Sequence, residues 1–255
     1  MSFGFALVRP RWVRKLLRPV LNRPRFLRFQ DGRKLAVILS DLRGPSFHMS
    51  YGYRAPERAL DGFEPEGRRL VESSLRARAE VGESPVFLDI GANIGLYAFS
   101  AVSAVPAVTV YGFEPHPRNV ACLLLTKRAN HWRNVHLEKI ALGDQLGPVN
   151  LYLDESDTGS HSLNQDSLWN NQASTACLRV PCATLDAWVE RRGLIRVDVI
   201  KLDVKGAEGA VLRGGMQTLR QFRPNILAEL QHEALAEDQS FLSALKELPF
   251  SYRVR

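Results

Sequence analysis

The sequence predicts an α/β fold in which a mostly parallel sheet is covered by helices on both faces. From residue 81 onward, apolar runs of strand length alternate with runs that have helical periodicity. This alternation is typical of parallel strands joined by crossover helices. The chain has 255 residues, 45% of them hydrophobic, which suits one such domain with an N-terminal extension. We expect the domain to span residues 81–255.

The elements of this domain follow one another in regular order. Apolar runs predict strands at 86–90, 108–113, 134–140, 197–202 and 225–230. Helices are predicted near 94–104, 117–129, 184–192, 207–222 and 239–247. After Gly143 we expect an inserted hairpin, with a Gly147-Pro148 turn leading into a strand at 149–153. Residues 154–176 are rich in Ser, Asn, Asp and Gln and predict a long polar lid or binding loop.

Residues 25–80 predict an extension made of a hairpin and a helix. Asp31-Gly32 is a typical hairpin turn, and apolar residues flank it on both sides within 25–40. Residues 56–80 are charged and predict one helix.

The first 24 residues predict a basic arm. Residues 1–34 contain ten Lys and Arg residues and one acidic residue, Asp31. The net positive charge of this segment therefore exceeds the net charge of +7 of the whole chain. Since the rest is slightly acidic, we expect no nucleic-acid partner. On a helical wheel, residues 10–20 separate apolar from cationic side chains. This amphipathic piece predicts peripheral contact with an anionic membrane surface. Packing on the domain or disorder are the alternatives.

The remaining composition predicts a cytoplasmic protein. No apolar run approaches the roughly 18 residues that cross a bilayer, and no secretory signal is visible. The three cysteines are odd in number and lack the paired spacing of a zinc site. They indicate reduced thiols rather than a disulfide framework.

Residues 86–95 (VFLDIGANIG) carry the first functional signal. An apolar run predicts a buried strand, and Gly91 and Gly95 predict a tight turn into a helix. Glycines let backbone approach a ligand because they lack a Cβ. The next apolar run ends at Glu114, about 23 residues beyond Gly91, and an acidic residue at about this distance grips the hydroxyls of a ribose. The region therefore predicts a site for a nucleoside-containing cofactor.

The charge of the motif distinguishes two cofactors. The spacing is Gly-x-x-x-Gly rather than the Gly-x-Gly-x-x-Gly of a dinucleotide site. Asp89 would repel a pyrophosphate but suits an ammonium or a sulfonium, which favours S-adenosylmethionine over NAD. Asp203 ends a further apolar strand, and ligands of open α/β sheets bind outside the carboxyl ends of strands. We therefore expect Asp89, Glu114 and Asp203 to line one crevice.

With these motifs in view, the chain resembles the FkbM-like methyltransferases, a family of S-adenosylmethionine-dependent O-methyltransferases. The resemblance covers roughly residues 80–235 and implies a Rossmann-like class I methyltransferase fold. It rests on five blocks in order: DIGANIG (89–95), FEPHP (113–117), ALGD (141–144), TLD (184–186) and KLDVKGAE (201–208).

The resemblance also implies residue roles. It assigns the methionine part of the cofactor to Asp89, Gly91, Asn93 and Gly95, the ribose to Glu114, and the vicinity of the adenine to Asp144. Related proteins usually have an acidic residue where this chain has Lys205, so a base or metal role at that position is not carried over. No His/Asp cluster has ligand spacing, and no metal site is expected.

Methyl transfer requires alignment of an acceptor oxygen with the activated carbon, helped by a base. Our catalytic candidates are Asp203, Glu208 and His232, while His161 in the polar loop is a weaker one. Asp203 as a helix cap and Glu208 as a favourable helix-start charge are the structural alternatives.

The predicted function is methylation of a hydroxyl on a sugar, glycolipid or secondary metabolite, with a small-molecule, glycan or lipid-linked partner. The alternatives are a nicotinamide-dependent oxidoreductase and a non-catalytic scaffold that retains the fold.

Overall fold

The computed structural model describes residues 23–38, 49, 56–153, 161–163, 176–229, 239–250 and 252. The predicted membrane-contacting segment 10–20, the candidate base His232 and most of the polar loop lie outside these residues. Within the described ranges, no helix is long and apolar enough to cross a bilayer.

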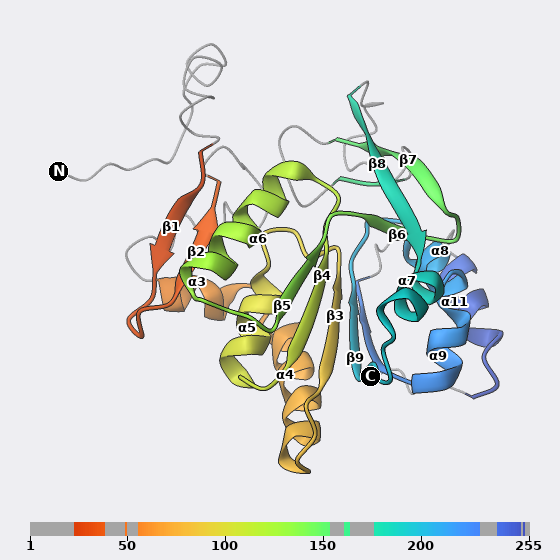
Figure 1. The fold of residues 1–255 in the computed structure, drawn as a ribbon, viewed down its shortest axis with the longest axis horizontal. Helices are drawn as coiled ribbons and strands as arrows, with labels where there is room; N and C mark the ends of the chain where they lie inside the picture. Colours follow the sequence, from red (N-terminus) through yellow and green to blue (C-terminus); the bar gives the residue numbers. More distant parts are fainter. Residues whose placement is uncertain are drawn as a thin grey trace.

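Five parallel strands form the central sheet, in the order β10-β9-β3-β4-β5 (Figure 1). The strands are β3 (Val86–Ile90), β4 (Thr109–Phe113), β5 (Val135–Glu138), β9 (Val199–Leu202) and β10 (Asn225–Ala228). The chain winds outward from β3 in one direction and later resumes beside it with β9 in the other. This reversal makes the gap between β3 and β9 the topological switch point, where such sheets bind ligands. The predicted Rossmann-like α/β fold is confirmed.

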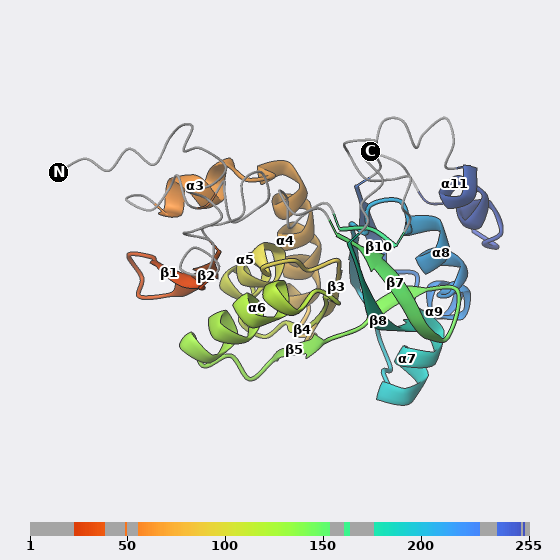
Figure 2. The same cartoon turned by 90° about the horizontal axis from the view of Figure 1, so that it is seen from above.

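Helices cover both faces of this sheet (Figure 2). One layer holds α4 (Pro65–Glu80), α5 (Leu96–Ala104) and α6 (Pro117–Ala129); the other holds α7 (Leu185–Arg192), α8 (Glu208–Arg213), α9 (Met216–Phe222) and α11 (Gln239–Lys246). Successive side chains of a strand point to opposite faces. Accordingly Phe87 packs with α4 and α5, whereas Leu88 and Ile90 pack in the cluster around Trp188 of α7.

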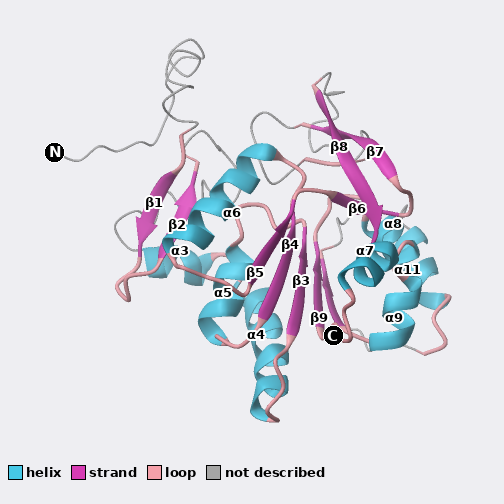
Figure 3. Cartoon of the chain, in the orientation of Figure 1, coloured by secondary structure: helices cyan, strands magenta, loops and turns pink. Residues whose placement is uncertain are grey.

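A second sheet stands beyond the carboxyl end of β5 (Figure 3). It consists of β6 (Ala141–Gly143), β7 (Gly147–Tyr152) and β8 (Cys177–Thr184), in the order β6-β8-β7. The predicted strand is confirmed as β7, but Gly147 and Pro148 are its first two residues and pair with β8 rather than forming a turn. Its antiparallel partner β8 begins where the polar loop ends. β8 has no counterpart among the strands predicted from the sequence.

Two predicted helices are each divided in the structure. Residues 56–80 form α3 (Pro56–Gly62) and α4, separated at Glu64, which has a left-handed φ of 41° just before Pro65. Residues 207–222 form α8 and α9, separated at Gly214. A Cβ on Gly214 would lie 2.1 Å from the carbonyl oxygen of Gly143. This close approach to β6 is a tertiary contact, and the helical periodicity of the sequence does not predict it.

The N-terminal hairpin is confirmed as β1 (Arg25–Arg28) and β2 (Lys34–Val37), paired antiparallel. It packs on α6, where the Ala36 N–H donates to Thr126 Oγ1 at 2.9 Å. The hairpin therefore shares a hydrophobic cluster with α5 and α6.

Candidate active site

A pocket lies at the carboxyl ends of β3, β4 and β9, at the switch point. The space between its walls is about 570 Å³, a volume that includes open solvent. Its walls come from the turns after these strands and from the second sheet. The lining residues are Ile90, Gly91, Asn93, Phe113, Glu114, Pro115, Ile140, Ala141, Leu142, Leu151, His161, Leu163, Asp203, Val204 and Lys205.

The turn after β3 requires glycine at both predicted positions. Gly91 and Gly95 have φ of 80° and 87°, a region that side chains with a Cβ rarely adopt. A Cβ on Gly91 would lie 1.9 Å from the carbonyl oxygen of Asp203, and one on Gly95 would lie 2.2 Å from Leu123 Cδ2. The first glycine therefore lets the β3 and β9 turns touch, and the second lets α5 begin against α6.

Glu114 follows β4 directly, and the two turns around it fix its carboxylate. Oε2 accepts the N–H of Asn93 at 2.9 Å, and Oε1 accepts the N–H of His116 at 2.8 Å. The side chain is nearly buried but lines the pocket. Burial raises the pKa of Glu114 to about 7, although these two N–H groups oppose the shift. A ligand that donates hydrogen bonds here would stabilise the ionised form.

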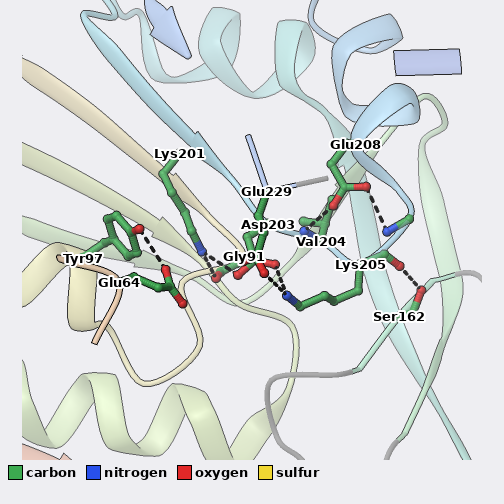
Figure 4. A network of polar contacts seen from close by, with 11 residues as sticks. Glu64, Gly91, Tyr97, Ser162, Lys201, Asp203, Val204, Lys205, Glu208 and Glu229 are labelled. Atoms are coloured by element: carbon green, nitrogen blue, oxygen red, sulfur yellow. Dashed lines mark hydrogen bonds and ion pairs between the residues drawn. The ribbon is translucent and has the colours of Figure 1, made fainter. Parts of the chain in front are cut away.

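Asp203 follows β9 and lies between two lysines (Figure 4). Lys201 Nζ lies 3.0 Å from its Oδ2, and Lys205 Nζ lies 2.8 Å from its Oδ1. Burial alone would raise the pKa of Asp203, but the two ammonium groups outweigh it and lower the pKa to about 2. The carboxylate is thus ionised at physiological pH and is a poor proton acceptor.

Lys205 and Glu208 shape the turn that follows Asp203. Lys205 has a left-handed φ of 50°, and its ammonium also lies 3.3 Å from Glu229 Oε1. The Glu208 carboxylate accepts the N–H groups of Val204 and Gly206, both at 2.9 Å. Both oxygens of Glu208 therefore hold the turn in place (Figure 4). This is a structural role at the start of α8, where the sequence also allowed a favourable helix-start charge.

Asp89 lies behind the pocket rather than in its wall. It is fully buried one residue before the end of β3, on the face that packs against α5. Cross-strand register places it beside Lys201. Neither of its carboxylate oxygens has a hydrogen bond of good geometry among the described residues, and burial raises its pKa to about 6. The expected crevice thus contains Glu114 and Asp203, with Asp89 beneath them.

The other candidates lie at different places. The Asp144 side chain is 43% exposed and pairs with Arg213 at 2.8 Å, outside the pocket lining. His161 lines the pocket, and its ring centroid lies 4.3 Å from that of His116. The pKa of the buried His116 is lowered to about 3, first by burial and then by the neighbouring His161 and Arg118.

Two features of the site were missed from the sequence. Lys201 is a buried cation within an otherwise apolar strand, and this interruption of the apolar run was a signal that could have identified it. Ser162 in the polar loop is 1% exposed, and its hydroxyl donates to the carbonyl of Lys205 at 2.5 Å. A bridge to Tyr152 of β7 holds the same residue. No local pattern marks that contact.

Comparisons with known proteins identify the family of the chain. Residues 89–252 match the model of the methyltransferase FkbM domain. The 2-O-methyltransferase NoeI of Sinorhizobium fredii is 29% identical over 204 residues, covering 74% of this chain and 83% of that protein.

A second relative is the 31-O-demethyl-FK506 methyltransferase FkbM of Streptomyces tacrolimicus. It is 27% identical over 167 residues, covering 55% of this chain and 63% of that protein, so the match spans less than two thirds of its length. The solved precorrin-6y C5,15-methyltransferase of Geobacter metallireducens has a TM-score of 0.38 and 14% identity, covering 71% of this chain and 68% of that one. The family match covers more than half of the chain, and the protein is a methyltransferase that belongs to the FkbM family.

Proposed function

We propose that the protein transfers a methyl group from S-adenosylmethionine to a hydroxyl of a small molecule or glycan. The observation that carries the proposal is the fixed carboxylate of Glu114 beside the Gly91–Gly95 turn at the switch point. A carboxylate at the end of the second strand suits the two neighbouring hydroxyls of a ribose. The apolar side chains of Phe113, Ile140 and Leu142 line the same pocket and suit a flat adenine ring.

The charge of the pocket favours a sulfonium over a pyrophosphate. The described lining residues include the carboxylates of Glu114 and Asp203 and the ammonium of Lys205, and the ammonium of Lys201 lies behind Asp203. Both ammonium groups are already paired, Lys201 with Asp203 and Lys205 with Asp203 and Glu229. A nicotinamide dinucleotide would bring further negative charge without a free cation to receive it. S-adenosylmethionine, when bound, supplies a methyl group on a positively charged sulfur, which an ionised Asp203 stabilises at a distance.

The polar residues then divide into separate roles. Asp203 contributes charge, because the lysines hold its pKa near 2 and leave it a weak base. Glu208 holds the turn through two N–H groups. His161 lines the pocket and is able to accept the proton of an acceptor hydroxyl. His232, outside the described residues, stays a second candidate for that step.

The acceptor is expected to contact the second sheet and the segment 161–163. Leu151, His161 and Leu163 bring this part of the chain into the pocket wall. Both curated relatives are named for methylation at oxygen, which supports a hydroxyl acceptor here. A lipid-linked acceptor would also engage the basic arm. Removal of residues 1–24 should then reduce partition onto anionic vesicles, and unchanged partition would contradict this part of the proposal.

The test is calorimetric titration of the protein with S-adenosylhomocysteine and, separately, with NAD. Binding of the former alone is expected. Glu114→Gln should weaken it by about 1–3 kcal/mol, the cost of disturbing a buried hydrogen-bonded group. Binding of NAD instead would overturn the proposal. Radiolabelled methyl transfer to a library of sugars and hydroxylated metabolites then tests turnover, and binding without any transfer would favour the scaffold alternative.

A further inference from the structure

Lys201 is a buried cation at the centre of the switch point. It is the third residue of β9, 6% exposed, and its cross-strand neighbour on β3 is Asp89. A buried ammonium is costly unless it is paired and hydrogen-bonded. The hydrogen bonds and ion pairs of the Lys201 ammonium therefore indicate the structural role of a lysine at this position.

These contacts join the two turns that line the pocket. Lys201 Nζ donates to the carbonyl oxygen of Gly91 at 3.2 Å and to Asp203 Oδ2 at 3.0 Å (Figure 4). It also lies 5.1 Å from the ring centroid of Tyr97 on α5. Gly91 follows β3 and Asp203 follows β9, so one ammonium bridges the turns on both sides of the switch point.

Charged groups from every neighbouring element face this ammonium. Asp89 faces it from β3, Asp203 from the turn after β9, and Glu64 from the residue before α4. Tyr97 of α5 donates its hydroxyl to Glu64 at 2.8 Å. Lys205 and Glu229 are linked to the group through Asp203. Burial lowers the pKa of Lys201, but the three carboxylates outweigh it, and the side chain stays charged.

We propose that Lys201 is a positioning residue of the cofactor site, whose ammonium holds the Gly91 turn and the Asp203 carboxylate in the relative placement that one ligand requires. The inference deepens the proposed function and rests on it. The close packing of the turns leaves little freedom for another arrangement, because a Cβ on Gly91 would already overlap the Asp203 carbonyl. Without the ammonium, the hydrogen bond from the Asp203 N–H to the Ile90 carbonyl, 3.1 Å, would remain, but the Asp203 carboxylate would lose its link to the Gly91 carbonyl.

The charge of Lys201 gives the proposal a second consequence. Lys201 lowers the pKa of both Asp89 and Asp203. Without the ammonium, both carboxylates should take up protons at higher pH, so the defect in binding should grow as the pH falls. A lysine that served stability alone would leave the pH dependence of ligand binding unchanged.

The test compares Lys201→Met with Lys205→Met, using calorimetric titration of S-adenosylhomocysteine between pH 6 and 8.5. Lys205 pairs with the same Asp203 but makes no described contact with Gly91, so it is the matched control. We expect Lys201→Met to weaken binding by about tenfold or more at pH 8, the scale of removing one partner from a buried hydrogen bond to a charged group. The ratio to wild type should rise toward pH 6. Lys205→Met should show a smaller loss.

The outcomes separate the inference from the proposed function. Absence of wild-type binding would overturn the proposed function. Wild-type binding together with equal affinity and equal pH dependence in folded Lys201→Met would overturn this inference alone. Thermal melting identifies whether that variant folds. If Lys201→Met does not fold, Lys201→Arg is tested instead, because the larger guanidinium keeps the positive charge. Weaker binding with the pH dependence of wild type supports a positioning role for Lys201. Unchanged affinity contradicts that role.

Discussion

Replacement of Gly91 by alanine tests whether the contact between the β3 and β9 turns forms the pocket. A left-handed backbone costs an alanine roughly 1–2 kcal/mol relative to the right-handed region. Reduced freedom of the unfolded chain returns about 0.4–1 kcal/mol. The new methyl group would lie 1.9 Å from the Asp203 carbonyl oxygen. Because this oxygen belongs to backbone, the β9 turn must move, and such overpacking adds about 1–3 kcal/mol.

Gly82 provides a matched control for this prediction. It has the same φ of 80° as Gly91, but nothing lies within 4 Å of a Cβ built on it. It precedes β3, at the opposite end of the strand from the pocket. Gly82→Ala should therefore cost about 1 kcal/mol or less and leave ligand binding unchanged. Gly91→Ala should cost about 1–3 kcal/mol more than Gly82→Ala and weaken binding as well.

Urea unfolding measures the loss of stability in both variants, and titration with S-adenosylhomocysteine measures the loss of affinity. The reasoning is refuted if the two variants lose equal stability and both bind like wild type. A large stability loss in Gly91→Ala with full affinity would show that the turns can separate without harm to the site.

Three further predictions concern the charged and polar residues of the site. Folding raises the pKa of Glu114 from 4.5 to about 7. Between these values the folded state therefore binds more protons than the unfolded state. The free energy of unfolding should then fall by up to about 1.4 kcal/mol as the pH rises from 6 to 7. Glu114→Gln should flatten this slope in urea titrations, and an unchanged slope would exclude Glu114 as its source. Asp144→Asn should alter the affinity for S-adenosylhomocysteine less than Glu114→Gln does, because Asp144 is exposed and outside the pocket lining. An equal loss of affinity would support the predicted role of Asp144 near the adenine. Ser162→Ala should lower the free energy of unfolding by about 1–3 kcal/mol, because it leaves the Lys205 carbonyl unpaired. Amide exchange at residues 152 and 162 should also become faster. Unchanged exchange would show that the Ser162 hydroxyl does not hold this segment.

Local patterns in the sequence determined the sheet, most helices and part of the site. Apolar runs fix buried strands wherever the sheet is covered on both faces, so β3, β4, β5, β9 and β10 were predicted within a few residues of their ends. Gly91 and Glu114 were predictable for a related reason. A glycine-rich turn and a strand-ending carboxylate are local signals, and the carboxyl ends of parallel strands meet at one edge.

Only the tertiary structure decided which side chains meet. Asp89 is one residue short of the strand end, and the two-residue period of a strand turns it toward α5 and Lys201 rather than into the pocket. The contact of Lys201 with Gly91 joins residues far apart in the chain, as does that of Ser162 with Lys205. The order of the strands and the packing of the turns set such pairs, and no local stretch of sequence records a contact between residues that are distant in the chain. The sequence thus determined which residues lie at the carboxyl edge of the sheet, whereas the fold decided which of them line the pocket.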